Sequence, residues 1–181
     1  MDIIRPIFSA EDLAQMPDDG KRYEVLEGDL AVSPSPNPQH QRIVLRCASF
    51  FQTLEQLGLG QVFTAPLDVV FDHHNVVEPD VLFVCQEHLN IVTDVNIQGP
   101  PDVAVEILSP GTRERDLTVK VRLYARFGVP EYWIVDPDNQ TLTVYRLTAD
   151  GYQPWGPYFP HETVTSPLFP DYPLSVTALF R

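Results

Sequence analysis

The chain has 181 residues, 44% of them hydrophobic, and carries a formal net charge of −13 from 25 acidic and 12 basic side chains. This size predicts a single domain over residues 1–181 with one core, and the excess of acid argues against a general basic surface for nucleic acids. Cys47 and Cys85 are isolated, and the sequence shows no secretory signal and no apolar run of membrane length. We therefore expect a soluble cytoplasmic protein with reduced thiols and no membrane partner.

A short helix and a hairpin are predicted near the N-terminal end. Ser9 and Asp12 fit a capping box that starts a helix over residues 9–16. Residues 21–26 follow as a strand, and a turn at residues 27–29 leads into a second strand. The two strands are expected to pair as a hairpin.

A long helix is predicted next, over residues 40–57. Asn37 is suited to cap this helix and Pro38 to occupy its first turn. Its apolar side recurs at helical spacing through His40, Val44, Cys47, Phe51 and Leu54. This face is expected to lie in the core, with His40 as a structural or capping residue at its start.

Two stretches with the composition of strands follow, and each is interrupted. Residues 62–71 are rich in β-branched and aromatic residues but contain Pro66, which predicts two pieces or an edge strand. Residues 76–84 predict another strand, although Glu78 and Asp80 lie within it. Acids are unexpected in an apolar strand. The favoured interpretation of Glu78 is a salt bridge at the rim, and the alternative is an accessory acid beside Asp80.

Residues 103–137 predict a strand, a tight turn, a helix and a second strand. Glu106 interrupts the apolar run of the first strand, and the helix is predicted over residues 113–127. Later strands are predicted at residues 131–136, 141–147 and 152–155, with a helical turn near residue 174. The order of elements predicts an α/β fold of the mixed α+β type, in which helices flank a central mixed sheet and an N-terminal helix and β-hairpin precede it.

Lys120 is the least expected residue of the predicted helix. At about 100° per residue, it falls on the apolar arc together with Leu117. A buried ammonium needs a counter-charge. Glu106 lies roughly 7 to 10 Å below the end of its strand and Lys120 about 8 Å into the helix, so the two side chains can meet at one depth. Asp116, one turn before Lys120, is expected to orient it.

Asp80, Glu106 and Lys120 together suggest hydrolytic chemistry. Two carboxylates on adjacent strands form a hard oxygen site that suits Mg²⁺ or Mn²⁺. A lysine beside them can assist the attacking water while the metal screens the phosphate charge. The set suits phosphodiester hydrolysis, and the alternative is a structural Lys-Glu pair without chemistry.

The strings VVEPDVLFV and VAVEILSPGTRERDLTVKVRLYARFGVPEYWIVDP resemble the Uma-two family of endonucleases, in the restriction-endonuclease-like PD-(D/E)XK superfamily. The resemblance implies a restriction-endonuclease-like core in which Asp80 and Glu106 are metal ligands, with the carbonyl of Ile107 as a third. The superfamily usually places its lysine two residues after the acid, where this chain has a leucine, and Lys120 is implied to take that role. Glu24 would be accessory, holding a second metal or a metal-bound water.

Other polar residues are predicted to have structural roles. Arg115, Arg122 and Arg126 share the arc opposite Lys120 and are expected to form a solvated helix face. His73 and His74 lie in a polar stretch that predicts a turn.

The leading hypothesis is an endonuclease that depends on Mg²⁺ or Mn²⁺ and acts on DNA through Asp80, Glu106, Lys120 and Glu24. A second hypothesis is a catalytically weak or inactive module that binds a nucleic acid or a protein through the same cleft. The acidity of the chain also fits a third, a hydrolase of a small phosphorylated substrate. A homodimer would provide the two active sites that cutting both DNA strands commonly needs.

Overall fold

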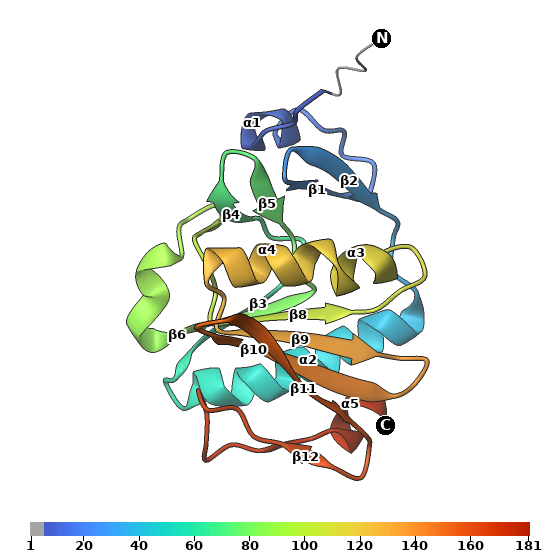
Figure 1. Ribbon diagram of the computed structural model, residues 1–181, viewed down its shortest axis with the longest axis vertical. Coiled ribbons are helices and arrows are strands. Elements are labelled where there is room, and N and C mark those ends of the chain that lie inside the picture. Colours follow the sequence, from blue (N-terminus) through green and yellow to red (C-terminus); the bar gives the residue numbers. More distant parts are fainter. Residues whose placement is uncertain (1–5) are drawn as a thin grey trace.

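The computed structural model describes residues 6–181, and Figure 1 shows how their elements are arranged. The helices are α1 (Ala10–Leu13), α2 (Pro38–Gln56), the 3₁₀ helix η1 (Gln86–Ile91), α3 (Arg113–Leu117), α4 (Val119–Phe127) and α5 (Thr177–Phe180). The strands are β1 (Arg22–Leu26), β2 (Asp29–Ser33), β3 (Gly60–Thr64), β4 (Val69–Asp72), β5 (Asn75–Val77), β6 (Val81–Cys85), β7 (Ile97–Gln98), β8 (Val103–Ile107), β9 (Glu131–Asp136), β10 (Thr141–Thr148), β11 (Gly151–Tyr158), β12 (Thr163–Val164) and β13 (Leu174–Ser175).

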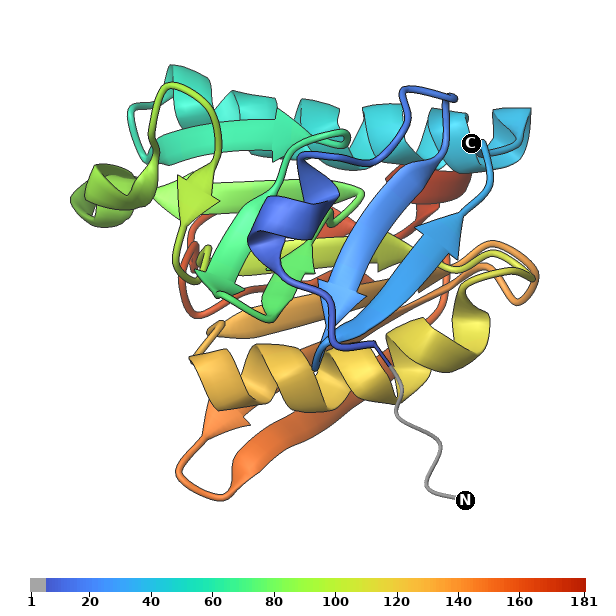
Figure 2. The same ribbon diagram turned by 90° about the horizontal axis from the view of Figure 1, so that it is seen from above.

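A mixed six-stranded sheet with the order β11-β10-β9-β8-β6-β3 forms the centre of the fold. β8 and β9 pair in parallel, and the other neighbours in this sheet pair antiparallel. α3 and α4 form the crossover that a parallel pair requires. Figure 2 shows α2 along one side of the sheet and α3 with α4 along the other. The predicted mixed sheet flanked by helices, preceded by a short helix and a hairpin, is confirmed.

Alternation along β8 divides the core into two layers. Val103, Val105 and Ile107 belong to the apolar cluster that contains the buried face of α2. Ala104 belongs to the cluster on the opposite face, under α4. Because successive side chains of a strand point to opposite faces, Glu106 emerges on the α4 side.

A second sheet, with the order β2-β1-β5-β4-β7, packs over one end of the first. The predicted strands at residues 62–71 and 76–84 are each divided between the two sheets. The segment Glu78-Pro79-Asp80 is therefore not inside a strand, as the sequence suggested, but joins β5 to β6. Proline cannot donate a hydrogen bond to a ladder, so the chain leaves one sheet and enters the other at this segment.

The helix predicted over residues 113–127 is broken at Thr118, whose backbone angles are φ −127° and ψ −74°. The Thr118 hydroxyl donates to the carbonyl oxygen of Glu114 at 2.6 Å, a bond that often bends helices. Leu117, which the continuous helix would bury, is 37% exposed. The break rotates α3 relative to α4.

Most other boundaries agree with the sequence. α2 begins as predicted, with the Asn37 side chain accepting from the backbone N–H of His40 at 2.9 Å. The helical turn expected near residue 174 is wrong, since β13 lies there and α5 follows it. None of the helices in residues 6–181 combines the length and apolar character that a membrane crossing requires.

The packing of α2 gives a test of the core. Phe51 is fully buried, with ring centroids 5.4 Å from Phe83 and 5.3 Å from Trp133. We predict that Phe51→Ala lowers the free energy of unfolding by about 3 to 5 kcal/mol in urea denaturation, because it leaves a cavity among these rings. The control Leu45→Ala, on the same helix at a site 67% exposed, should change it by less than about 0.5 kcal/mol. Equal effects of the two substitutions would contradict this packing.

Candidate active site

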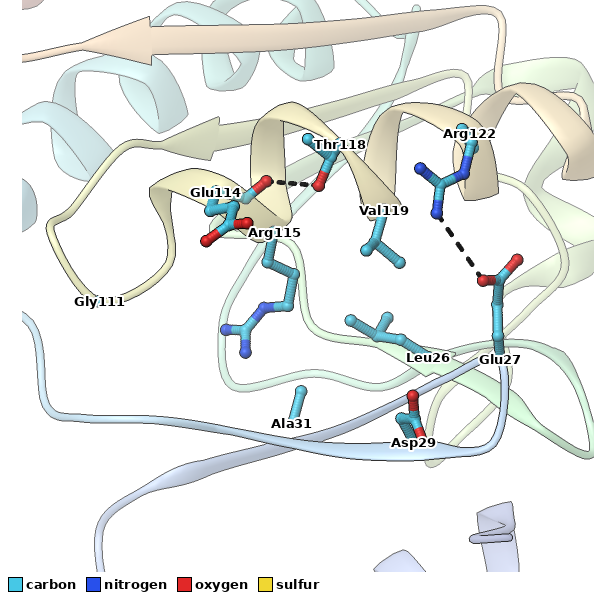
Figure 3. Close-up of a pocket in the computed structure, with 10 residues that line it drawn as sticks. All are labelled: Leu26, Glu27, Asp29, Ala31, Gly111, Glu114, Arg115, Thr118, Val119 and Arg122. Atoms are coloured by element: carbon cyan, nitrogen blue, oxygen red, sulfur yellow. Dashed lines mark hydrogen bonds and ion pairs between the residues drawn. The ribbon is translucent and has the colours of Figure 1, made fainter. Parts of the chain in front are cut away.

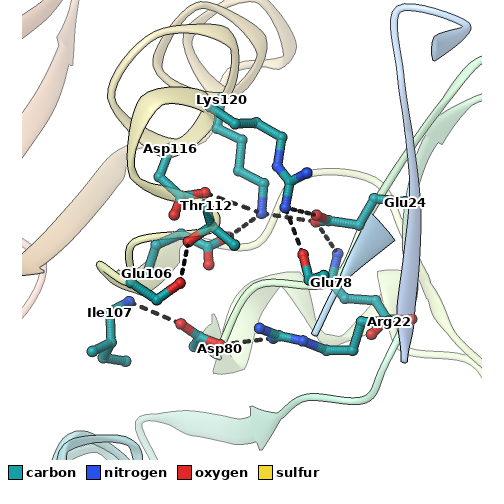
Figure 4. Close-up of polar contacts among 12 residues, drawn as sticks. Arg22, Glu24, Glu78, Asp80, Glu106, Ile107, Thr112, Asp116 and Lys120 are labelled. Carbon is teal, nitrogen blue, oxygen red and sulfur yellow. Dashed lines mark hydrogen bonds and ion pairs between the residues drawn. The ribbon is translucent and has the colours of Figure 1, made fainter. Parts of the chain in front are cut away.

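Lys120 lies in the first turn of α4, only 2% exposed, and is surrounded by carboxylates. Its Nζ is 2.7 Å from Oε1 of Glu106 and 2.7 Å from Oε1 of Glu24, and 3.7 Å from Oδ1 of Asp116 (Figure 4). The Tyr124 hydroxyl also donates to Oε1 of Glu106, at 3.2 Å. The predicted contact of a buried lysine with Glu106 is present, and so is the i, i+4 contact with Asp116.

The strand β1 supplies Glu24 and Arg22 from one face, because residues two apart on a strand point the same way. Glu24 is 2% exposed. Its Oε1 accepts from the backbone N–H of Glu78 at 2.9 Å, and its Oε2 is 3.6 Å from Nη2 of Arg115. Glu24 is therefore part of the buried cluster, and Glu78 is held against it by the backbone. Glu78 forms no salt bridge within residues 6–181, so the rim ion pair predicted for it is wrong.

Arg115 also differs from its prediction. Its side chain is 18% exposed and donates to the Ser33 hydroxyl, so it points toward the cluster rather than into solvent. The prediction placed all three arginines on one continuous helix. Because the chain breaks at Thr118, α3 and α4 do not share one helical axis, and Arg115 on α3 faces another direction. Arg122 and Arg126, on α4, are exposed as predicted, at 64% and 49%.

Asp80 is held by partners from three separate elements. Oδ1 accepts from Nη1 of Arg22 at 2.7 Å, and Oδ2 lies 3.0 Å from Nε2 of His40 on α2. Oδ2 also accepts from the backbone N–H of Ile107, at 2.8 Å. This last bond places the Asp80 carboxylate beside the residue that follows Glu106 on β8, as Figure 4 shows.

Sequence reasoning missed the contacts of Arg22 and His40 with Asp80. His40 is 5% exposed, and its position on the apolar face of α2 was a usable signal, because a buried imidazole requires a partner. Arg22 could have been predicted to face the cluster, because it lies two residues from Glu24 on a predicted strand and therefore points to the same side. Neither signal identifies Asp80 as the partner without the fold.

The cluster holds more acid than base. The buried or half-buried acids are Glu24, Glu78, Asp80, Glu106 and Asp116, and the facing cations are Arg22, Arg115 and Lys120. Burial raises the pKa of Glu106 well above its usual range, against the opposing effect of Lys120. Burial, with Asp68 and Glu24, raises the pKa of Glu78 to about 7. The surplus of negative charge is thus partly relieved by retained protons.

Lys120 and Glu24 are both ionised. Burial disfavours the charge of Lys120, but Glu106, Glu24 and Asp116 outweigh it and raise the lysine pKa above its ordinary value. Burial likewise opposes ionisation of Glu24, and Lys120 overcomes it and lowers the pKa of that carboxyl. Lys120 is therefore an ammonium at neutral pH and a poor proton acceptor, whereas Glu24 is a carboxylate.

The donor set has the chemistry of a site for a hard divalent cation. Both carboxylate oxygens of Asp116 and Oε2 of Glu78 are buried and have no hydrogen-bond partner among residues 6–181. Oxygen-rich, negatively charged surroundings are those that Mg²⁺ and Mn²⁺ prefer. The geometry is not preformed, however, since no three His, Cys, Asp or Glu side chains of residues 6–181 are grouped to hold an ion. The residues fit a cation chemically, and Arg22 pairs with one oxygen of Asp80.

Comparisons with known proteins agree with the fold. Residues 10–177 match the Uma2 family, described as "Putative restriction endonuclease". A crystal structure from Anabaena variabilis ATCC 29413, described as "a putative nuclease belonging to DUF820", is 23% identical in sequence, with a TM-score of 0.79. That match covers 96% of this chain and 97% of the other. No curated protein sequence matches the chain.

The charge balance of the cluster can be tested through stability. Lys120→Met leaves Glu24 and Glu106 buried together without their shared cation, so we predict a loss of about 3 to 5 kcal/mol in the free energy of unfolding. Lys120→Met/Glu106→Gln should recover part of this loss. Arg122→Met, which removes a cation that is 64% exposed, should cost less than about 1 kcal/mol. Urea denaturation measures all three, and a Lys120→Met protein as stable as Arg122→Met would contradict the cluster.

Proposed function

Because the chain belongs to the Uma2 family, which covers residues 10–177, we propose that it is a metal-dependent endonuclease that hydrolyses phosphodiester bonds in DNA. The observation that carries the proposal is the buried ammonium of Lys120, 2.7 Å from Glu106 and 2.7 Å from Glu24. Asp80 is fixed next to this pair through the Ile107 N–H. A buried amine in contact with several carboxylates suits phosphate-ester hydrolysis. It suits acyl transfer less well, because that reaction needs a nucleophile and its base.

We assign Asp80 and Glu106 as the residues that would hold Mg²⁺ or Mn²⁺, with the Ile107 carbonyl as a third donor. When bound, the cation would screen the charge of the phosphodiester and stabilise the charge that develops on it. The surplus of carboxylates and the raised pKa of Glu106 support this assignment, because a cation there would replace protons that the acids otherwise retain.

The other residues of the cluster act around these ligands. Lys120 keeps Glu24 and Glu106 in place and, as an ammonium, provides positive charge near the scissile phosphate. Glu24 is ionised, whereas Lys120 already carries its proton. Of these two residues, Glu24 is therefore the one that can accept the proton of the attacking water. Glu24 itself is held by the N–H of Glu78, so its orientation is set by the backbone.

Substrate can approach the cluster through two cavities. One, of about 410 Å³, is lined by Asp80 and Arg22 together with Lys21, His40 and Thr64. The other, of about 240 Å³, has no acid in its lining and includes Ser109 and Thr112. A phosphate in the second cavity would meet Arg22 and His40, the two side chains that hold Asp80. Cleavage of both strands would require two such centres, and we propose a homodimer for that purpose.

The second candidate is a binding module of the same fold with weak or absent catalysis. The ion pair between Arg22 and Asp80, at 2.7 Å, favours it, since both oxygens of Asp80 already have protein partners. Metal binding without cleavage would support this candidate.

Nicking of supercoiled plasmid in Mg²⁺ or Mn²⁺ tests the endonuclease. We predict that Asp80→Asn and Glu106→Gln each reduce the rate by about 100-fold or more, because each removes a carboxylate proposed to hold the cation that would stabilise the transition state. Glu87→Gln, an exposed acid on η1, should cleave as the wild type does. Cleavage that persists in both site variants would show that a different centre, or a contaminant, is responsible.

Calorimetry with Mn²⁺ tests the competition at Asp80. Arg22→Met frees Oδ1 of Asp80 from a charge-assisted bond of 2.7 Å, so we predict about tenfold tighter ion binding. Asp80→Asn should abolish binding. An affinity that neither substitution changes would place the ion elsewhere.

A further inference from the structure

Arg42 and Arg46 differ from most of the cations of the protein. In residues 6–181, every other Lys and Arg except Arg181 has a carboxylate oxygen within 4.0 Å. Arg42 and Arg46 have none, although the acidic residues outnumber the basic ones by 25 to 12. They lie one turn apart on α2, so both project from the same side of the helix. An acidic protein thus keeps two adjacent guanidinium groups without a counter-charge from residues 6–181.

Both arginines line a cavity of about 310 Å³ that has no acid in its wall. Its lining residues are Pro38, Gln39, Arg42, Ile43, Arg46, Gln140 and Phe180. The cavity between the hairpin and α3–α4, shown in Figure 3, differs because acidic residues line it. It includes Glu27, Asp29 and Glu114, and its Arg122 faces Glu27 at 4.0 Å. A phosphate is therefore favoured at the first cavity and opposed at the second.

Gln140 adds a second indication that the cavity is a binding site. It has φ +52°, in the left-handed region, at the turn between β9 and β10. That conformation costs a residue with a Cβ about 1 kcal/mol or more, and glycine would avoid the cost. Here it places an amide side chain in the lining of the arginine cavity, where amide and guanidinium groups are common donors to phosphate oxygens.

The arginine cavity and the acid-free cavity beside Arg22 both border the start of α2. Asn37 and His40 line the acid-free cavity beside Arg22, whereas Gln39 and Arg42 line the arginine cavity. From His40 to Arg46 the helix advances about 9 Å at ~1.5 Å per residue. The first turn of this helix also carries a partial positive charge. Neither lining contains a carboxylate, so neither cavity repels a polyanion that lies across the first turn of α2.

We propose that Arg42 and Arg46, with Gln39 and Gln140, bind a backbone phosphate of the nucleic acid that flanks the phosphate to be cleaved. The inference rests on the proposed endonuclease function and extends it by naming the surface that receives the substrate strand. Contacts of this kind carry no sequence information, and they set the position of the strand over the catalytic cluster.

The test compares Arg42→Ala/Arg46→Ala with the matched pair Arg122→Ala/Arg126→Ala, which removes two exposed arginines that already face Glu27. Binding of a short fluorescein-labelled DNA duplex is followed by anisotropy in EDTA, which prevents cleavage, over a series of KCl concentrations. Loss of this phosphate contact should weaken binding about tenfold or more and reduce the slope of log affinity against log salt by about 0.9. The matched pair should retain the wild-type affinity and slope.

A second readout separates substrate positioning from chemistry. Hydrolysis of bis(p-nitrophenyl) phosphate, a diester without a flanking phosphate, should be unchanged in Arg42→Ala/Arg46→Ala and lost in Asp80→Asn. Because Nη1 of Arg46 donates to the Leu179 carbonyl at 3.2 Å, Arg42→Glu alone is the safer variant for folding. It should also weaken duplex binding, since no hydrogen bond or ion pair ties the Arg42 side chain to residues 6–181.

The outcomes are distinct. Wild-type protein that binds and cleaves DNA, with affinity and salt slope unchanged in Arg42→Ala/Arg46→Ala and in Arg42→Glu, would overturn this inference and leave the endonuclease intact. Wild-type protein that neither binds the duplex nor cleaves the diester would overturn both. Equal losses in the arginine variant and the matched pair would show a general charge effect and would also overturn the inference.

Discussion

A single buried ammonium sets the geometry of the candidate site. Nζ of Lys120 lies 2.7 Å from a carboxylate on β1 and 2.7 Å from another on β8, two strands that belong to different sheets. Lys120 keeps Glu24 ionised in the interior and is the cation that Glu24 and Glu106 share. The contact therefore joins the small sheet, the central sheet and α4 at one point, and the catalytic hypothesis depends on that junction.

The fold brings these groups together by interrupting a strand and a helix that the sequence pattern predicts to be continuous. Glu78-Pro79-Asp80 leaves β5 and enters β6, which puts Asp80 within reach of β1, α2 and β8 at once. Thr118 breaks the helix after β8 and turns Arg115 inward to Glu24. The resulting cluster is richer in acid than in base, which suits a divalent cation, and Arg22 pairs with Asp80 at 2.7 Å.

Local patterns in the sequence were enough for part of this account. The mixed sheet, the hairpin and α2 followed from periodicity and caps, and an isolated lysine on an apolar arc was enough to predict its contact with Glu106. The partners of Asp80 did not follow, because Arg22 and His40 lie 58 and 40 residues away in the chain. Arg115 was placed wrongly because one helical projection was carried across a break that only tertiary packing at Thr118 reveals. The resemblance of VVEPDVLFV to a nuclease family supplied the proposed role of Asp80 as a metal ligand, which spacing alone would not have given.

The most direct measurement is anomalous diffraction from a crystal soaked in Mn²⁺. The account predicts an anomalous peak within coordination distance of carboxylate oxygens from both Asp80 and Glu106, with Lys120 still against Glu106 and the Arg22 guanidinium displaced from Oδ1 of Asp80. A soaked crystal with no peak between these two acids, and with Arg22 still bound to Asp80, would contradict the central claim that the cluster is built to hold a divalent ion.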